Sequence, residues 1–361
     1  MPRNIIKSNN AVIAVSTGTE AFSTNTADMN LFNAVQNTSF SIAVEHQPSK
    51  QIGTQDFGLN DVFIQPDVEI TFSYYPEPKL ENEVHGNFIK TVDGYNGFIR
   101  AFSGTLENNT NFYLLNNPDQ ERDILDFINL NSTETNLNGF ESASFGNCFL
   151  TSYGLTYGVD SLPTVTTSYV CSNMKFEALT GTSMVAPSIN LESGNNNNVG
   201  RARFAFVTGT KDPVLVNPKN PESTITLQNL QAGGQILSGT HFVQSLDMSV
   251  SLQRVSSYGL GSDYAYNRKA QLPAQGVFNV NSLVSGYDDG TISGILGNET
   301  DYTFDLVLDG SGKDMTYSID GAKLENYSYS LPVNGIMTFN ASFTFEVTEK
   351  KGLRLSGTYY T

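Results

Sequence analysis

Apolar and polar residues alternate along most of this chain, which is the pattern of a β-strand with one buried face. Asn-Gly and Asp-Gly pairs, which favour tight hairpin turns, separate many of these runs. The clearest runs occupy residues 40–44, 68–74, 246–252, 302–308 and 337–347. The sequence therefore predicts a mainly β protein built from antiparallel strands.

One segment departs from this alternation and has the features of a helix. Asn117 is a suitable N-cap, Pro118 suits the first helical position, and Gln120 is placed to close a capping box. Acidic residues follow in the first turn, where the helix dipole favours them. Apolar residues at helical spacing follow over 124–128. We expect one short helix over residues 118–129.

Two stretches of the chain superpose on two later stretches without a gap. Residues 35–53 match residues 243–261, because both open on Val-Gln, continue with alternating apolar residues and end at a glycine. Residues 153–169 match residues 327–343 through shared aromatic, valine and serine positions. Both halves keep the blocks in the same order, so internal duplication is the simplest explanation. Alternation common to all β-strands is the other explanation.

On this interpretation the fold class is mainly β, with two tandem β-sandwich or partial-barrel domains related by duplication and one short helix in the first copy. The connector between them is rich in Asn, Pro and Gly, with short strands expected at 203–207 and 224–227. The expected parts are an N-terminal arm (1–30), a first β domain (31–191), the connector (192–240) and a second β domain (241–361).

Composition predicts a neutral to acidic surface. Charged residues make up 16% of the chain and the net charge is −16, so uncharged Asn, Ser, Thr and Gln must cover much of the surface. Such groups cost less to desolvate than ions, which suits broad protein contacts. The acidic balance disfavours adhesion to nucleic acid but allows DNA to slide past. We expect no signal peptide, no membrane span and no membrane partner.

Cys148 and Cys171 are the only cysteines. Two cysteines provide neither a disulfide framework nor a zinc ligand set. We expect them on adjacent strands of one hairpin, and reduced as in a cytoplasmic product.

The segment 181–187 resembles the serine motif of subtilisin-like proteases, with Ser183 as the nucleophile. That chemistry needs a histidine base and an aspartate to orient it. The three histidines are His46, His85 and His241, and none lies in the motif and order that the protease family uses. The segment after Ser183 is also a poor helix sequence. A loop leaving a strand is the better interpretation, so we expect no enzyme activity.

Other motifs are better explained by structure than by chemistry. The segment 310–313 lacks the first glycine and the Ser/Thr of a phosphate loop, so we expect a hairpin turn. Asp288 and Asp289 are typical of a turn, and Glu81 and Glu83 of a solvated loop. Strand aromatics suit a sheet core better than a sugar platform; they are Phe72, Tyr74, Tyr75, Tyr327 and Tyr329. We expect no catalytic, cofactor-binding or metal-binding residue and no cofactor.

The arrangement of these blocks resembles the major tail proteins, or tail tube proteins, of long-tailed bacteriophages in a duplicated-domain form. The resemblance is one of pattern over most of the chain, and it rests on residues 40–44, 153–170, 246–252 and 327–347. It implies β-sandwich domains flanked by a helix. It also implies stacked rings of six domains whose inner strands join into one barrel.

For a duplicated chain, the resemblance implies a structural virion protein that forms a trimeric ring with pseudo-six-fold symmetry. Its partners would be further copies of itself, stacked into a tube, and other tail proteins. DNA would pass through an acidic lumen during ejection without binding. The protein would be assembled in the host cytoplasm and located in the virion tail.

Two other functions compete with the tube. A tail-tip or fibre module would bind a host receptor or glycan and would not stack into tubes. A subtilisin-type enzyme would be labelled at Ser183 by a serine-directed fluorophosphonate. Sandwich folds host many functions, so the fold alone does not decide between the first two.

Overall fold

A computed structural model gives the architecture of the chain. It describes residues 11–17, 27–31, 35–50, 57–76, 110–117, 139–159, 161–178, 183–185, 201–206, 223–232, 235–236, 242–257, 267–283, 301–310, 313–333, 335–348 and 352–357. The predicted mainly β class is confirmed, because the secondary structure of these residues consists of strands and contains no helix.

The strands follow the alternating runs of the sequence closely. In chain order they are β1 (Ala11–Thr17), β2 (Ala27–Leu31), β3 (Val35–Lys50), β4 (Phe57–Tyr74), β5 (Thr110–Asn116), β6 (Glu141–Gly158), β7 (Thr164–Ala178), β8 (Ser183–Val185), β9 (Arg201–Phe206), β10 (Ser223–Ala232), β11 (Gln235–Ile236), β12 (Phe242–Ser251), β13 (Arg254–Ser257), β14 (Asn267–Ala270), β15 (Ala274–Leu283), β16 (Tyr302–Gly310), β17 (Lys313–Ser330), β18 (Thr338–Val347) and β19 (Leu353–Gly357).

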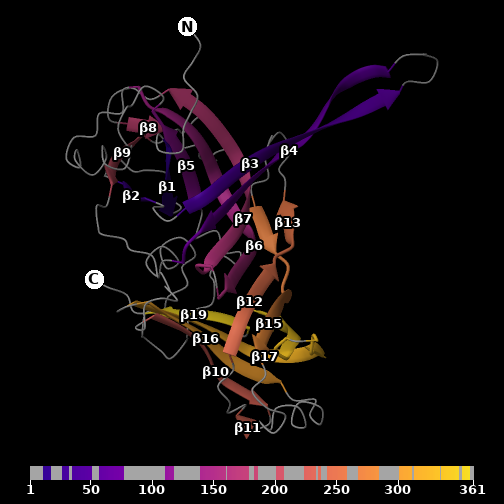
Figure 1. Cartoon of the computed structure of the whole chain (residues 1–361). Coiled ribbons are helices and arrows are strands. Elements are labelled where there is room, and N and C mark those ends of the chain that lie inside the picture. Colours follow the sequence, from indigo (N-terminus) through magenta and orange to yellow (C-terminus); the bar gives the residue numbers. More distant parts are fainter. Residues whose placement is uncertain are drawn as a thin grey trace.

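Antiparallel pairing arranges these strands in two sets with the same order. The first module is the set β1-β5-β6-β7-β4-β3, and the second module is the set β10-β16-β17-β18-β15-β12. Strand β12 also pairs with β6, which joins the two modules into one large sheet. Figure 1 shows the first module above the second, with β6 and β12 at the junction.

The two modules match in register as well as in order. The residues that face one another across β3, β4 and β7 match those that face one another across β12, β15 and β18. The two rows are Phe40–Ile70–Tyr169 and Met248–Phe278–Phe343. This spacing is the one at which the two sequence blocks superpose, so the sequence match is also a match of position in the sheet.

Irregularities of pairing occur at the same places in both modules. A β-bulge is an extra residue in one strand that bends the ladder, so its position is a specific feature. The matching pairs of bulge sites are Val35/Asn37 with Val243/Ser245, Thr110/Phe112 with Tyr302/Phe304, and Leu150/Ser152 with Leu324/Asn326. The match therefore includes β5 and β16, which the sequence blocks did not align.

Each module has a core of buried aromatic rings between two layers of strands. In the first module the rings of Phe112 and Tyr169 lie 4.8 Å apart, and in the second the equivalent rings of Phe304 and Phe343 lie 5.7 Å apart. All four side chains are buried. Tilted and edge-on ring pairs of this kind add to the stabilisation that comes from burying apolar area.

Two of the segments expected outside the β domains contain strands of the large sheet. Within the expected N-terminal arm 1–30, Ala11–Thr17 forms β1, which pairs with β5 along its whole length. The reason is its apolar run, since Val12, Ile13 and Val15 are buried. Part of the expected connector 192–240 also belongs to the sheet, because β10 pairs with β16.

Other expectations are confirmed or lie outside the described residues. The two short strands expected in the connector are β9 and β10. The predicted helix 118–129 lies outside the described residues, although its expected cap, Asn117, is buried at the end of β5.

Candidate functional site

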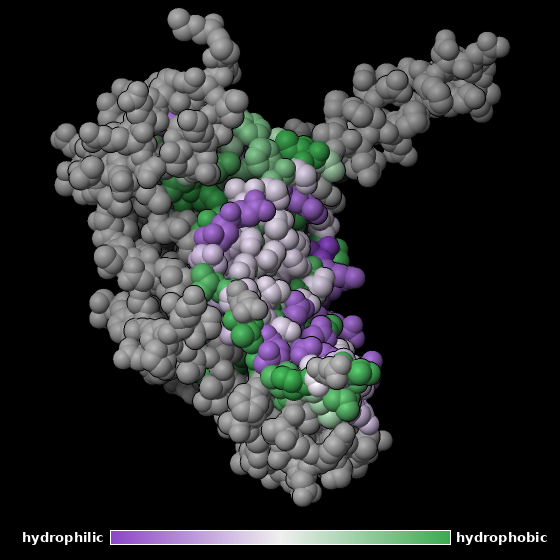
Figure 2. Space-filling view, in the orientation of Figure 1, coloured by the Kyte–Doolittle hydropathy of each residue, from purple (hydrophilic) through white to green (hydrophobic). Residues whose placement is uncertain are grey.

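One face of the joined sheet runs without interruption across eight strands. Strands β3, β4, β7, β6, β12, β15, β18 and β17 lie side by side in that order. Alternate residues of each strand point into the aromatic cores, and those between them point to the opposite face. Figure 2 shows this opposite face as a polar band in the middle of the molecule. We call it the polar sheet face.

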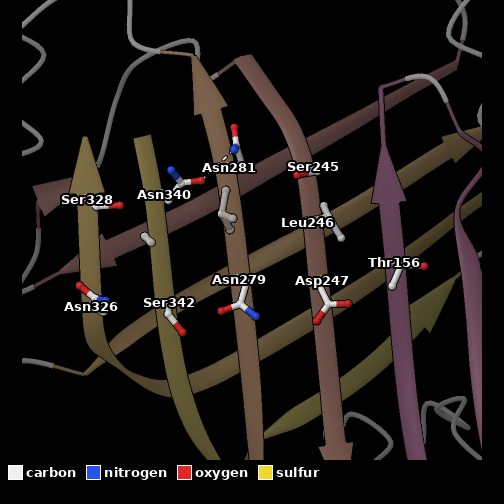
Figure 3. A pocket seen from close by; sticks show the side chains of 12 residues that line it. Thr156, Ser245, Leu246, Asp247, Asn279, Asn281, Asn326, Ser328, Asn340 and Ser342 are labelled. Atoms are coloured by element: carbon white, nitrogen blue, oxygen red, sulfur yellow. Dashed lines mark hydrogen bonds between the residues drawn. The ribbon is translucent and has the colours of Figure 1, made fainter. Parts of the chain in front are cut away.

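Short uncharged side chains make up most of the polar sheet face. Figure 3 shows them on β17, β18, β15, β12 and β6, with the strands of the other layer crossing behind. They line a shallow hollow of about 410 Å³, together with Asp247; the labelled uncharged polar residues are Thr156, Ser245, Asn279, Asn281, Asn326, Ser328, Asn340 and Ser342. The polar alternation of the sequence thus becomes one continuous surface.

Hydrogen bonds between neighbouring strands hold these side chains in rows. In the second module Asn281 Nδ2 donates to Asn340 Oδ1 at 2.7 Å. In the first module the hydroxyls of Thr71 and Ser168 are hydrogen-bonded at 3.1 Å. Cross-strand polar pairs of this kind stabilise a sheet without needing charge.

The charges on this face are mainly acidic. Glu69 and Asp247 lie among the uncharged residues, while Glu346 lies near the end of β18. Glu325 accepts a hydrogen bond of 2.8 Å from the hydroxyl of Thr344. Within the described part of the chain, no group of three or more His, Cys, Asp or Glu side chains is placed to hold a metal ion.

The junction between β6 and β12 is built like the interior of a sheet. Val159 N donates to the carbonyl of Gln244 at 2.9 Å, and Leu252 N donates to the carbonyl of Thr151 at 2.7 Å. Regular pairing runs between these two bonds. Beneath it the hydroxyl of Tyr153, from the first module, meets the hydroxyl of Tyr317, from the second, at 3.0 Å.

A half-buried arginine strengthens this junction. Arg254, at the start of β13, donates from Nε to the carbonyl of Leu150 at 2.6 Å and from Nη1 to the carbonyl of Arg268 at 2.8 Å. Its guanidinium also lies 5.4 Å from the ring centre of Phe149. Burial, reinforced by the nearby charge of Arg268, lowers the pKa of Arg254 to about 10. Sequence reasoning missed the contact with Leu150, because the two residues lie far apart in the chain.

The motifs singled out in the sequence do not converge on one site in the described part of the chain. Ser183 lies in β8, which pairs with β9. His85 and His241 lie outside the described residues, as do Asp288, Asp289, Glu81 and Glu83. The expected turn at 310–313 is confirmed, since Gly310 pairs with Lys313 across β16 and β17.

The strand aromatics and the cysteines are mostly where the sequence placed them. Phe72 and Tyr74 are fully buried, which confirms them as core residues, whereas Tyr75, Tyr327 and Tyr329 are half-buried. Cys148 faces Cys171 across β6 and β7, as expected for one hairpin, and their sulfur atoms are 2.7 Å apart. Both are free thiols, and burial together with Cys171 raises the pKa of Cys148.

Comparison of the chain with protein-family models found no match, and neither did comparison with curated proteins. The described residues also include no helix with the length and apolar character needed to cross a membrane.

Proposed function

We propose that this chain is a structural, non-enzymatic protein that assembles into rings and tubes, as the tail tube protein of a long-tailed bacteriophage does. In this proposal the two modules arose by internal duplication and act as two equivalent domains. Three chains would supply six modules to one closed ring. Rings would stack into a conduit for DNA in the virion tail, with other tail proteins at its ends.

The observation that carries the proposal is the equivalence of the modules within one sheet. Strand order, register and bulge positions agree between them. The junction leaves the outer edges of the joined sheet at β3 and β17, which have no strand partner there among the described residues. Exposed strand edges invite pairing with another chain, and closure into a ring removes them.

The chemistry of the polar sheet face fits the wall of a conduit. A surface of Asn, Ser and Thr with Glu69 and Asp247 offers DNA phosphates few cations to bind and some repulsion. A lumen of this kind would let DNA pass without adhesion. The same neutral surface is poorly suited to nucleophilic or acid–base catalysis, which requires activated groups.

The direct test is negative-stain electron microscopy of the purified protein over a concentration series, with its mass in solution measured in parallel. Hollow rings or tubes with three chains per ring support the proposal. A single chain that never stacks at high concentration contradicts it. That result would favour the tail-tip or fibre module, for which a glycan-binding screen is the next experiment.

A further inference from the structure

The junction inside one chain provides a template for the contact between two chains. It pairs β12 of the second module with β6 of the first. The equivalent of β12 in the first module is β3, and the equivalent of β6 in the second module is β17, by the register matches described above. These equivalents are the strands at the two outer edges of the joined sheet.

We propose that β3 of one chain pairs antiparallel with β17 of the next chain, in the register that joins β12 to β6. This inference rests on the proposed self-assembly and specifies the residues that meet. In the junction Met248 faces Leu155. Transferring that pair to the equivalent positions places Phe40 opposite Tyr329 of the next chain. One pair fixes the whole antiparallel register, so Ile42 meets Tyr327 and Ser41 meets Ser328.

This register continues both faces of the sheet across the boundary. Phe40 and Ile42 come opposite tyrosines on the core side, while Ser41 comes opposite a serine on the polar sheet face. A slip by one residue would reverse every side chain and set Phe40 against serines. The side-chain alternation of β3 and β17 therefore agrees with a register that comes from the β6–β12 junction alone.

Exposure of the two edges is consistent with a missing partner. Met248 and Val250 are 0% and 1% exposed beside β6, whereas the equivalent Phe40 and Ile42 are 41% and 40% exposed. Apolar residues are also visible in Figure 2 where the β3–β4 ribbon leaves the sheet. At the other edge, Leu331 is 65% exposed just beyond β17. Apolar side chains in such positions mark interaction surfaces.

A groove under β3 provides a second, independent sign. At the junction, Tyr153 of the first module extends under β12 of the second module, where its hydroxyl meets the hydroxyl of Tyr317. Tyr317 faces Leu306 across β17 and β16, and Ala143 faces Leu114 across β6 and β5. Because these two pairs occupy equivalent positions, Ala143 is the first module's equivalent of Tyr317. Where the large tyrosine is replaced by alanine, a groove of about 430 Å³ lies open between Phe40, Leu114 and Phe176.

The side chain that this groove would receive is Tyr327 of the next chain, the equivalent of Tyr153. Its neighbours there would be the rings of Phe40 and Phe176, whose centres lie 6.1 Å apart. The groove is mainly apolar, and the polar residues of its lining are Asn116, Glu141 and Ser142. A tyrosine that buries its ring in such a groove is a typical anchor of a protein interface. The occupant of the groove is therefore a second copy of this chain.

Paired cysteines test the register directly. Val159 and Gln244 form a hydrogen-bonded position of the junction, so the alternate positions, which include the equivalent of Ser41 and Ser328, are not hydrogen-bonded. Cα atoms at such positions are close enough for a disulfide. We expect Ser41→Cys with Ser328→Cys to give an interchain ladder on a non-reducing gel after mild oxidation. Ser39→Cys with Ser328→Cys, two residues out of register, should give none.

The outcomes separate the contact from the proposed ring. A ladder of cross-linked chains from the in-register pair alone supports the contact between β3 and β17. If that ladder extends beyond three chains and no closed rings form, the contact is supported and the three-chain ring is contradicted. Hollow tubes that show no cross-link at this pair, or that cross-link through the shifted pair, overturn the contact and leave the tube intact. Each single-cysteine variant is the control for random collisions.

A charge on the edge provides a second measurement. Ile42→Lys should weaken association roughly 100-fold, because the contact would bury an unpaired cation at an anchor position. Thermal unfolding of the single chain should change little, since Ile42 is already exposed. Val255→Lys is the matched control, because Val255 is 50% exposed on β13, which pairs with β14 and is neither of the two edge strands. Equal association by the two variants would overturn the contact.

Discussion

The equivalence of the two modules can be tested by replacing one facing pair of residues in the second module with the equivalent pair of the first. Gly276 faces Phe345 across β15 and β18, and the equivalent pair in the first module is Val68 facing Cys171. The second module thus combines no side chain with a large ring, where the first combines two medium-sized side chains. A β-carbon added at Gly276 would lie 2.7 Å from Cε1 of Phe345 and still closer to two other ring atoms.

Each single exchange should destabilise the fold. Gly276→Val should cost about 3 kcal/mol or more, because the added side chain would displace the buried ring of Phe345. Phe345→Cys should cost about 3–4 kcal/mol, because it leaves a cavity over the glycine. The double variant recreates the pair of the first module. We expect it to lose at least 2 kcal/mol less than the sum of the two single losses.

Urea unfolding of the purified full-length chain in reducing buffer measures these free energies. It should be followed at a concentration where the chain is a single molecule, so that assembly adds nothing. Val68→Gly with Cys171→Phe is the reciprocal exchange and should show favourable coupling of the same sign. Additive losses, within about 0.5 kcal/mol, would refute the equivalence of these positions.

Three further predictions follow from the junction and the thiols. Tyr153→Phe and Tyr317→Phe should each reduce the free energy of unfolding by about 1–1.5 kcal/mol, and the double variant by less than the sum, because a lone buried hydroxyl is the costly state; an additive urea-unfolding cycle would contradict this. Arg254→Met should cost about 2–3 kcal/mol by urea unfolding through loss of its bonds to two carbonyls, whereas the exposed Lys269→Met should cost under about 0.5 kcal/mol. Burial raises the pKa of Cys148, so the unfolded chain loses this thiol proton at a lower pH than the folded chain does. The free energy of unfolding should therefore be highest below about pH 8.5 and should fall above it by up to about 1.4 kcal/mol per pH unit. Urea midpoints across this range should show a shallower fall for Cys148→Ala.

The sequence predicts the strands well where alternation is regular. The runs 246–252 and 302–308 correspond to β12 and β16, and the ungapped match of 153–169 with 327–343 reflects equal positions in the sheet. It predicts less where a strand is buried on both faces. Val12–Val15 is almost continuously apolar, so it lacks the alternation by which β1 would have been found.

The candidate surface required information that a single sequence does not contain. Alternation assigns Asn279 and Asp247 to the face opposite the core, but it does not say which strand lies next to which. The β6–β12 pairing joins residues far apart in the chain, and so does the bond from Arg254 to Leu150. The equivalence of β5 with β16 was also hidden, because their sequences share only a Phe-X-Leu spacing, at Phe112–Leu114 and Phe304–Leu306.

The β6–β12 junction has a consequence for the kinetics of assembly. Because both strands belong to one chain, this contact forms with a fixed effective concentration, whatever the amount of protein present. If the outer edges repeat it between chains, half of the boundaries in a closed ring are complete before any two molecules meet. Only the remaining half obeys mass action. Formation of a ring from three chains would then depend on the third power of concentration, whereas a ring of six one-module chains would depend on the sixth power. Nucleation would therefore proceed at lower expression levels than for a subunit with a single module.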